Sequence, residues 1–338
     1  MGQIRSISKL NISKNRERKS LNKNLNTLNA EKYVAKIAYY PGCSLNSTAI
    51  DFNISIKNLF DFLGIKLEEI QDWNCCGTTP AHNISHELSV ELSSRNLFLA
   101  KKMGFNEILS PCVSCYCKLF KAAEVLNKRN IKDTNEVATG SDNSENFNFK
   151  IYSIVEYLLK YKDLIKEKYL NYKLNLKQTK KTSDAGQDLI DEILRNLKPV
   201  CYYGCVLLRT EDINRFDSFE NPTSMERVLE TVDIKCNNFS FKTECCGAIL
   251  SLTHKDIVLK LSKRILDVAI ESGANSIIVC CPLCQQNLDM RQNQINKYYK
   301  AKYNIPIYYI SQILGLSLGL SYKDMAINKL FVLPEINK

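Results

Sequence analysis

The sequence predicts an α/β protein made of two similar, pseudo-symmetric half-domains, each a small parallel sheet with flanking helices. Three observations support this fold class: a cysteine pattern that occurs twice, non-cysteine residues that repeat at matching offsets, and short apolar runs alternating with helix-length segments. Alternating strands and helices are typical of parallel sheets. A repeat of this length indicates a duplicated domain, because solenoid repeats are much shorter.

The cysteine pattern consists of one cysteine, then an adjacent pair, then a Cys-x-x-Cys pair. The groups are separated by 31 and 35 residues in the first copy and by 39 and 34 residues in the second. Ten of the fourteen cysteines belong to the two copies. The first set is Cys43, Cys75, Cys76, Cys112 and Cys115, and the second set is Cys205, Cys245, Cys246, Cys281 and Cys284.

Other residues repeat with the cysteines. Arg95 and Arg264 both lie 17 residues before the first cysteine of their Cys-x-x-Cys pair, and Gly104 and Gly273 lie 8 residues before it. The segments around the single cysteines (YYPGC and YYGC) and the adjacent pairs (NCCG and ECCG) also match, and the halves end alike in IYSIVEYLL and IYYISQILG. The matches indicate two copies of one half-domain of roughly 110–150 residues.

In each half, a short apolar and aromatic run leads into the single cysteine. We predict buried strands at 36–40 and 199–203, because each run is followed closely by a glycine. A helix is expected next at about 47–63, with Ser47 or Thr48 as its N-cap.

The adjacent cysteine pairs are predicted to lie in loops, and each is followed by a helix, at about 86–103 and 253–272. The runs NEILS and NSIIV then indicate strands that lead directly into Cys-x-x-Cys and a further helix. Cysteines are thereby placed beyond the carboxyl ends of parallel strands, where such sheets bind ligands. The N-terminus of the following helix favours thiolates and an anionic group.

The sequence divides into five segments by composition and repeat. We expect a basic, disordered arm at 1–35, since residues 1–30 hold seven Lys or Arg and a single acid. The other segments are an N-terminal half-domain at 36–171 with a polar insertion at about 127–150, an exposed linker at 172–197, a C-terminal half-domain at 198–320 and a tail at 321–338.

Composition limits the class of protein. No apolar run reaches the ~18 residues of a membrane span, and no signal-peptide core is evident at the N-terminus. We therefore expect a cytoplasmic protein, or one held peripherally at a membrane by partners, with reduced thiols. No motif supports nucleic-acid binding, despite the net charge of +10.

Five thiols in each set exceed the four that a zinc ion or a cubane cluster uses. Adjacent cysteines point in different directions on an extended backbone, so they suit an opened iron–sulfur cluster with a bridging thiolate better than one compact ion. Two alternatives remain open: zinc held by the Cys-x-x-Cys pairs, and a thioredoxin-like dithiol, which would leave three cysteines of each set unexplained.

The doubled motif resembles the cysteine-rich CCG domain of the heterodisulfide reductase B-subunit family, in a bacterial-type form. The resemblance is carried by YYPGCSLNSTA, DWNCCGTTPAH and CPLCQQNLD and covers about residues 36–320. It implies a noncubane [4Fe-4S] cluster on each five-cysteine set. It also implies that the paired clusters reduce or form a disulfide by two one-electron steps, with Cys43, Cys75, Cys76, Cys205, Cys245 and Cys246 nearest the chemistry.

The resemblance also implies partners. These are an iron–sulfur protein like the C subunit of heterodisulfide reductase, a flavoprotein like its A subunit, and a disulfide or dithiol substrate. The alternative is a non-catalytic electron-transfer or membrane-associated subunit of a quinone-linked succinate or fumarate reductase-type complex, with succinate dehydrogenase-like partners. The chain has no G-x-G-x-x-G motif opening a helix, so we expect no flavin or nicotinamide site in it.

Several other residues are candidates for secondary roles. A histidine near an adjacent cysteine pair could protonate a departing thiolate, although a capping or surface histidine is the simpler interpretation. An indole could shield a cluster, and the matched arginines could offset its charge. These candidates, with the four cysteines that have no counterpart across the repeat, are His82, His86, His254, Trp73, Arg95, Arg264, Cys117, Cys201, Cys236 and Cys280.

Overall fold

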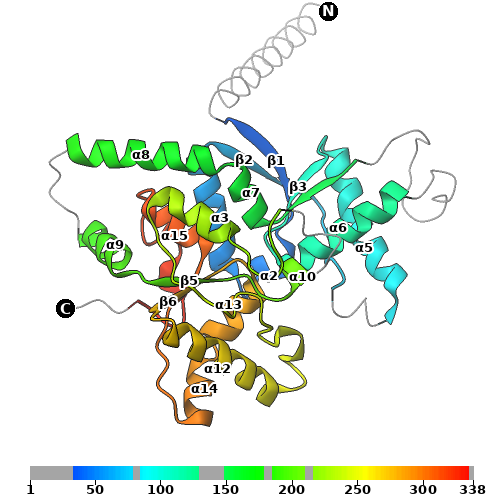
Figure 1. Cartoon of the computed structure of the whole chain (residues 1–338). Helices are drawn as coiled ribbons and strands as arrows, with labels where there is room; N and C mark the ends of the chain where they lie inside the picture. The colour runs from blue at the N-terminus through cyan, green and yellow to red at the C-terminus, as the bar shows by residue number, and fades with distance from the viewer. Residues whose placement is uncertain (1–32, 79–83, 129–147, 179–184, 210–215, 335–338) are drawn as a thin grey trace, which may run out of the picture.

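The computed structural model describes residues 33–78, 84–128, 148–178, 185–209 and 216–334 (Figure 1). Most of the predicted basic arm, most of the polar insertion and His82 lie outside these residues. The described chain contains two parallel sheets with flanking helices, so the predicted fold class is confirmed.

The first half is built on a four-stranded sheet in the order β2-β1-β3-β4. All of its pairings are parallel, with Ala38 opposite Ile108 and Ile108 opposite Ile151. Its strands are β1 (Ala35–Tyr39), β2 (Ile65–Glu69), β3 (Glu107–Leu109) and β4 (Lys150–Tyr152), and its helices are α2 (Gly42–Leu45), α3 (Ile50–Leu63), α5 (His86–Lys102), α6 (Val113–Lys128) and α7 (Ile154–Lys160).

The second half is built on a three-stranded parallel sheet in the order β5-β6-β7. Its counterpart to β2, residues 234–239, is irregular and reaches the sheet through the Asn237 N–H, which donates to Pro199 O at 2.8 Å. The strands are β5 (Pro199–Tyr202), β6 (Ser276–Val279) and β7 (Ile307–Tyr309), and the helices are α10 (Val206–Arg209), α11 (Ser224–Leu229), α12 (Lys255–Glu271), α13 (Pro282–Asp289), α14 (Gln292–Tyr299) and α15 (Ile310–Ser317).

The expected N-cap of the first long helix is wrong. The helix begins at Ile50 after Ala49, because Ser47 uses its hydroxyl to donate to Cys43 O at 2.8 Å and so closes the short turn α2. The helix ends at Gly64, whose φ of 74° lies in the left-handed region that glycine adopts at the C-terminus of many helices.

The segment 172–197 that joins the halves is helical over most of its described residues. Helix α8 (Lys162–Gln178) runs into it, and α9 (Ala185–Asn196) fills its second part. It is not exposed throughout, because Ile190 and Ile193 on α9 are buried. The apolar positions of α9 recur at helical spacing, so one face of this helix contributes to the core of the protein.

The two halves pack on each other reciprocally. Helix α15 at the end of the second half packs on α3 of the first (Figure 1). Helix α7 at the end of the first half packs on α11 of the second. At the first contact, the rings of Phe52 and Tyr309 stack with centroids 4.0 Å apart, and the buried hydroxyls of Ser55 and Ser311 lie 2.7 Å apart. The two contacts are therefore equivalent to each other, as a pseudo-twofold relation requires.

Candidate metal centres

The first cysteine set gathers beyond the carboxyl ends of β1, β2 and β3. Cys43 lies in α2, the pair Cys75-Cys76 lies in the loop after β2, and Cys112 immediately precedes α6, which contains Cys115. The Sγ atoms of Cys76 and Cys115 are 3.3 Å apart. Further thiol contacts link Cys43 to Cys75, Cys75 to Cys76 and Cys112 to Cys115, so all five thiols form one group.

Charge in this group concentrates on Cys75, because the pKa of the adjacent Cys76 is raised and that of Cys75 is lowered. Thiol hydrogen bonds from Cys43 and Cys76 and a bond from the Gly77 backbone lower the pKa of Cys75 to about 2. Contacts with Cys112 and Cys76, together with burial, raise the pKa of Cys115. Cys43 and Cys75 are exposed whereas the other three thiols are buried. The set therefore has an enclosed side and an open side.

The second set occupies the equivalent positions. Cys205 follows β5, Cys245 and Cys246 lie in a loop, and Cys281 is the N-cap of α13, which contains Cys284. The Sγ atoms of Cys246 and Cys284 are 3.8 Å apart. Hydrogen bonds from the Cys284 thiol and from backbone N–H groups at the start of α13 lower the pKa of Cys281, as expected for a thiol at a helix N-terminus.

The two sets adjoin each other across the interface between the halves. One of the backbone N–H groups that lowers the pKa of Cys281 belongs to Val113, the residue after Cys112 in the other half. Helix α2 of the first half contacts α13, and α10 of the second half contacts α6. In each case the short helix that contains or follows the single cysteine of one half packs on the helix that contains the last cysteine of the other half.

The same cross-contact is made by a pair of equivalent residues. Cys117 and Gln286 each lie two residues after the last cysteine of their set. The Cys117 thiol lies 3.9 Å from Val206 O, and the Gln286 amide donates to the Thr48 hydroxyl. Cys117 thus has a structural counterpart across the repeat that is not a cysteine, which is why a search for matching cysteines misses it.

Two tyrosines that the sequence analysis did not single out hold the adjacent cysteine pairs in place. Tyr40 and Tyr202 each lie three residues before a single cysteine and are fully buried. The Tyr40 hydroxyl donates to Asn74 O at 2.7 Å, and the Tyr202 hydroxyl donates to Glu244 O at 2.6 Å. Asn74 and Glu244 immediately precede the adjacent pairs. The repeated YY of both motifs is the signal that could have identified these tyrosines.

Equivalent glycines allow the close approach of chain segments within each set. A Cβ atom on Gly42 would lie 2.8 Å from the Cys115 Sγ, and one on Gly204 would lie 2.7 Å from the Cys284 Sγ. Both glycines have positive φ, of 71° and 73°. Residues with a side chain would push the thiols apart, so the backbone is shaped around a compact group of five sulfur atoms. Such a donor set fits an iron–sulfur cluster, whose protein ligands are cysteine thiolates.

The secondary candidates lie outside the two thiol groups. His86 and His254 are exposed, at the starts of α5 and α12. The Trp73 ring meets Tyr40 edge-on with centroids 5.5 Å apart, and Arg95 donates to Asp72 O and the Asn74 side chain. Arg264 lies over the ring of Phe241. Trp73 and Arg95 therefore support the loop that leads to Cys75.

The remaining three unmatched cysteines belong to the core of the second half. The thiols of Cys201 and Cys236 are 3.5 Å apart, and the Cys280 thiol donates to Tyr203 O at 3.7 Å. All fourteen cysteines are free thiols. Within the described ranges, no three or more His, Cys, Asp or Glu side chains are arranged to hold a single metal ion.

A cavity of about 770 Å³ opens beside the second set and is lined by residues of both halves. All five cysteines of that set border it. The first half contributes, beside Thr48, a group of residues next to the first set: Thr78, Val113, Ser114, Cys117 and Lys118. The hydroxyl of Thr78 is 3.0 Å from the Cys76 thiol. One cavity therefore borders the second set directly and the first set through a single layer of residues.

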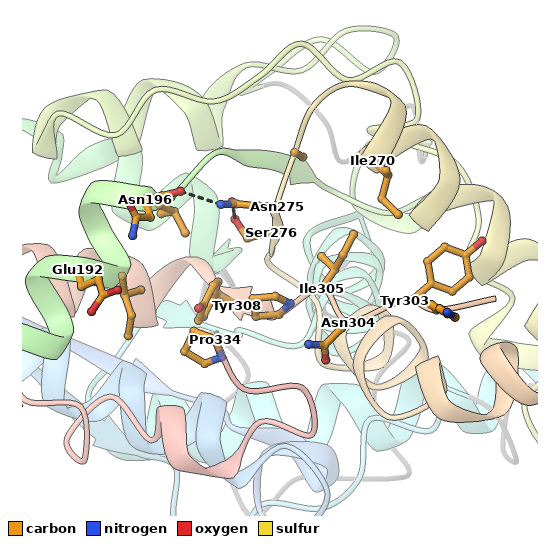
Figure 2. Close-up of a pocket in the computed structure, with 15 residues that line it drawn as sticks. Glu192, Asn196, Ile270, Asn275, Ser276, Tyr303, Asn304, Ile305, Tyr308 and Pro334 are labelled. Carbon is orange, nitrogen blue, oxygen red and sulfur yellow. Dashed lines mark hydrogen bonds between the residues drawn. The ribbon is translucent and has the colours of Figure 1, made fainter. Parts of the chain in front are cut away.

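A second cavity of about 440 Å³ lies at the other edge of the β5-β6-β7 sheet, where β6 and β7 begin (Figure 2). Asn275, Ser276 and Tyr308 line it together with Glu192 and Asn196 of α9. None of the described residues that line it is a cysteine, so the thiol chemistry belongs to the first cavity.

Fold and site together define a duplicated α/β protein with two cysteine-rich centres. A family model described as the cysteine-rich CCG domain matches residues 37–120 and 200–289, one match in each half. The chain belongs to this cysteine-rich domain family. The resemblance to the heterodisulfide reductase B-subunit family is confirmed by relatives that carry this name.

Two relatives illustrate the range of the family. The chain is 29% identical over 293 residues, covering 87% of this chain and 95% of that protein, to the 8-methylmenaquinol:fumarate reductase membrane anchor subunit of Wolinella succinogenes. It is 26% identical over 304 residues, covering 88% of this chain and 93% of that protein, to the B subunit of the ferredoxin/F420H2-dependent CoB-CoM heterodisulfide reductase of Methanosarcina acetivorans.

A solved structure supports the fold. The crystal structure of a hypothetical protein from Helicobacter pylori matches with a TM-score of 0.58 at 15% identity, over 89% of this chain and 52% of that chain. Among the helices of the described part of the chain, none is long and apolar enough to cross a membrane.

Proposed function

We propose that this protein is the iron–sulfur subunit of a multi-subunit oxidoreductase, with one four-iron cluster, of the noncubane type, on each five-cysteine set. The observation that carries the proposal is the equivalence of the two sets: each gathers five thiols at the carboxyl edge of a parallel sheet, and the sets adjoin each other across the interface. Bound clusters would supply one-electron transfer. The polypeptide supplies ten thiolates, two helix N-termini and a cavity that borders the second set.

We further propose that the complex is a quinone-linked reductase of the fumarate or succinate type. The similarity to the Wolinella membrane anchor subunit extends over 95% of that protein. In this role the chain passes single electrons between succinate dehydrogenase-like partners and an electron carrier. Gene context or co-purification with a flavoprotein of that type tests this function.

A second candidate is disulfide reduction. It is favoured by the cavity, which places Cys245, Cys246, Cys281 and Cys284 against a space that a small disulfide could enter. Partners would then resemble the A and C subunits of heterodisulfide reductase. Reduction of a disulfide by the purified complex with an artificial one-electron donor, and its loss in Cys246→Ser, would support this candidate.

The metal content tests the proposal common to both candidates. After anaerobic purification, we expect about eight irons and about eight sulfides per chain, from two four-iron clusters. One or two zinc ions per chain, with no iron, would contradict the proposal. The measurement does not depend on which partners the protein has.

A further inference from the structure

The cavity beside the second set has a wall that thiol chemistry does not explain. Away from the cysteines, it is bordered by the apolar side chains of Val206, Ile249, Leu252, Leu283 and Met290. Among its described lining residues, the ionic side chains are Lys118 and Arg291, and none is a carboxylate. Lys and Arg side chains carry hydrogen-bond donors and no acceptors. A ligand with an apolar body and oxygen atoms that accept hydrogen bonds from these two cations fits this wall.

The two cations come from opposite halves. Lys118 lies on α6, one residue after Cys117, and Arg291 immediately precedes α14. Arg291 is held in place, because its Nε donates to Asn287 Oδ1 at 2.9 Å and its Nη2 lies 3.5 Å from Ser251 O. Asn287 in turn donates to Cys246 O at 3.1 Å. The guanidinium is therefore positioned relative to both the loop at the cavity edge and the second cysteine set.

The edge of the cavity is formed by an exposed apolar turn that follows Gly247. In this turn, residues 248–252, the Ile249 side chain is 74% exposed and Leu252 is 100% exposed. Val206 and Met290 beside them are also exposed. Large apolar side chains that gather in water around a cavity entrance mark a surface used for an apolar ligand or a membrane. Basic residues beside such a surface suit contact with anionic lipids.

We propose, resting on the quinone-linked function above, that this cavity binds the ring of a lipid-soluble quinone and that turn 248–252 presents its entrance to the membrane surface. A quinone ring has an apolar body and two carbonyl oxygens that only accept hydrogen bonds. Lys118 and Arg291 supply donors for these oxygens. The volume of about 770 Å³ is within the range of small-molecule sites. A small anionic disulfide would also meet the cations, but it gives the exposed apolar turn no role.

The ring site is tested by binding of a fluorescent quinone analogue, 2-heptyl-4-hydroxyquinoline N-oxide, to the anaerobically purified full chain. We expect saturable quenching of the probe and roughly tenfold weaker binding to Lys118→Gln, which loses one charged donor. Lys121→Gln is the matched control, because Lys121 is an exposed lysine on the same helix that does not line the cavity. Equal weakening by both variants would overturn the site. The site would also be overturned if the wild-type protein holds its iron but does not bind the probe. Binding of a bis-sulfonated organic disulfide in place of the probe would overturn it as well.

The membrane contact is tested by co-sedimentation with vesicles of phosphatidylglycerol and phosphatidylethanolamine. The variant with Ile249→Ser and Leu252→Ser is expected to bind several-fold less than the wild type. Phe331→Ser, at an apolar side chain that is 65% exposed and does not line the cavity, is expected to bind normally. Absence of wild-type binding, or equal loss in the control, would overturn the membrane contact. A wild-type protein that is purified without iron, or that does not associate with a flavoprotein, would instead count against the proposed function itself.

Discussion

Replacing Gly204 by alanine should remove the second iron–sulfur cluster while leaving the fold intact. Two effects act on this position. Its φ of 73° lies in the left-handed region, which costs an alanine roughly 1–2 kcal/mol. In addition, the new Cβ would lie 2.7 Å from the Cys284 Sγ, whereas ordinary contacts begin at 3.4 Å. An ordinary contact is restored only when the two atoms separate by a further 0.7 Å, the difference between these distances.

This displacement decides the outcome. Metal sites tolerate ligand distances within about 0.2 Å of their usual values, so a thiol that is moved several times further is lost as a ligand. The assay is iron and sulfide content after anaerobic purification. We expect Gly204→Ala to hold about half of the wild-type iron, since one of two clusters is affected.

Gly273 provides the matched control in the same half. Its φ is 76°, but the atom nearest to a new Cβ is the Asn237 Nδ2 at 3.5 Å, an ordinary contact. Gly273→Ala should therefore show a similar loss of thermal stability and full iron. In the first half, Gly42→Ala and Gly104→Ala form the same comparison, because a Cβ on Gly104 meets nothing within 4 Å. If Gly204→Ala and Gly273→Ala hold equal iron, the reasoning is refuted.

Three further predictions concern the packing and the ligands. Burial raises the pKa of Glu156 from 4.5 to about 7. The contribution of this carboxyl to stability is therefore fully present below about pH 4.5 and is lost as the pH rises through about 7. Glu156→Gln should reduce the difference in the free energy of unfolding between pH 5 and pH 8, measured with urea, by about 2–3 kcal/mol, and an unchanged difference would contradict the prediction. Phe52→Ala should lower the free energy of unfolding by about 3–5 kcal/mol, because it removes a fully buried ring that joins the halves; a loss below about 1 kcal/mol would show that the interface contributes little. Cys246→Ser removes one thiol of the second set and should lower the iron content to about half of the wild-type value, as Gly204→Ala does. Cys236→Ser, outside both sets, should keep full iron; a loss of iron only in Cys236→Ser would refute the ligand assignment.

Much of the architecture could be predicted because the repeat marks it. Glycines at matched offsets end α5 and α12, and apolar runs before Cys112 and Cys281 form β3 and β6. The strands β2, β4 and β7 could not be predicted in this way. β2 has the sequence IKLEE, which is more than half polar and only partly buried. β4 and β7 have three residues each, as β3 does, but no cysteine follows them to mark where the strand ends.

The arrangement of the site was less accessible to sequence reasoning. The two thiol groups could be assembled from spacing alone, since cysteines after neighbouring parallel strands lie at one edge of the sheet. The contacts between the halves could not be predicted from spacing, because they depend on how two folded surfaces pack together. The approach of the Val113 N–H to Cys281, and the counterpart relation of Cys117 and Gln286, result from that packing.

The reciprocal contacts of α3 with α15 and of α7 with α11 have a consequence for the history of the chain. They are the contacts that two identical copies of one half-domain would make in a symmetric dimer, where every contact occurs twice. Fusion of two such copies into one polypeptide frees each copy to change separately. The position two residues after the last cysteine of each set has become Cys117 in one half and Gln286 in the other. A single chain can thereby keep two similar cysteine sets while giving its shared cavity two different walls, which a symmetric dimer could not do.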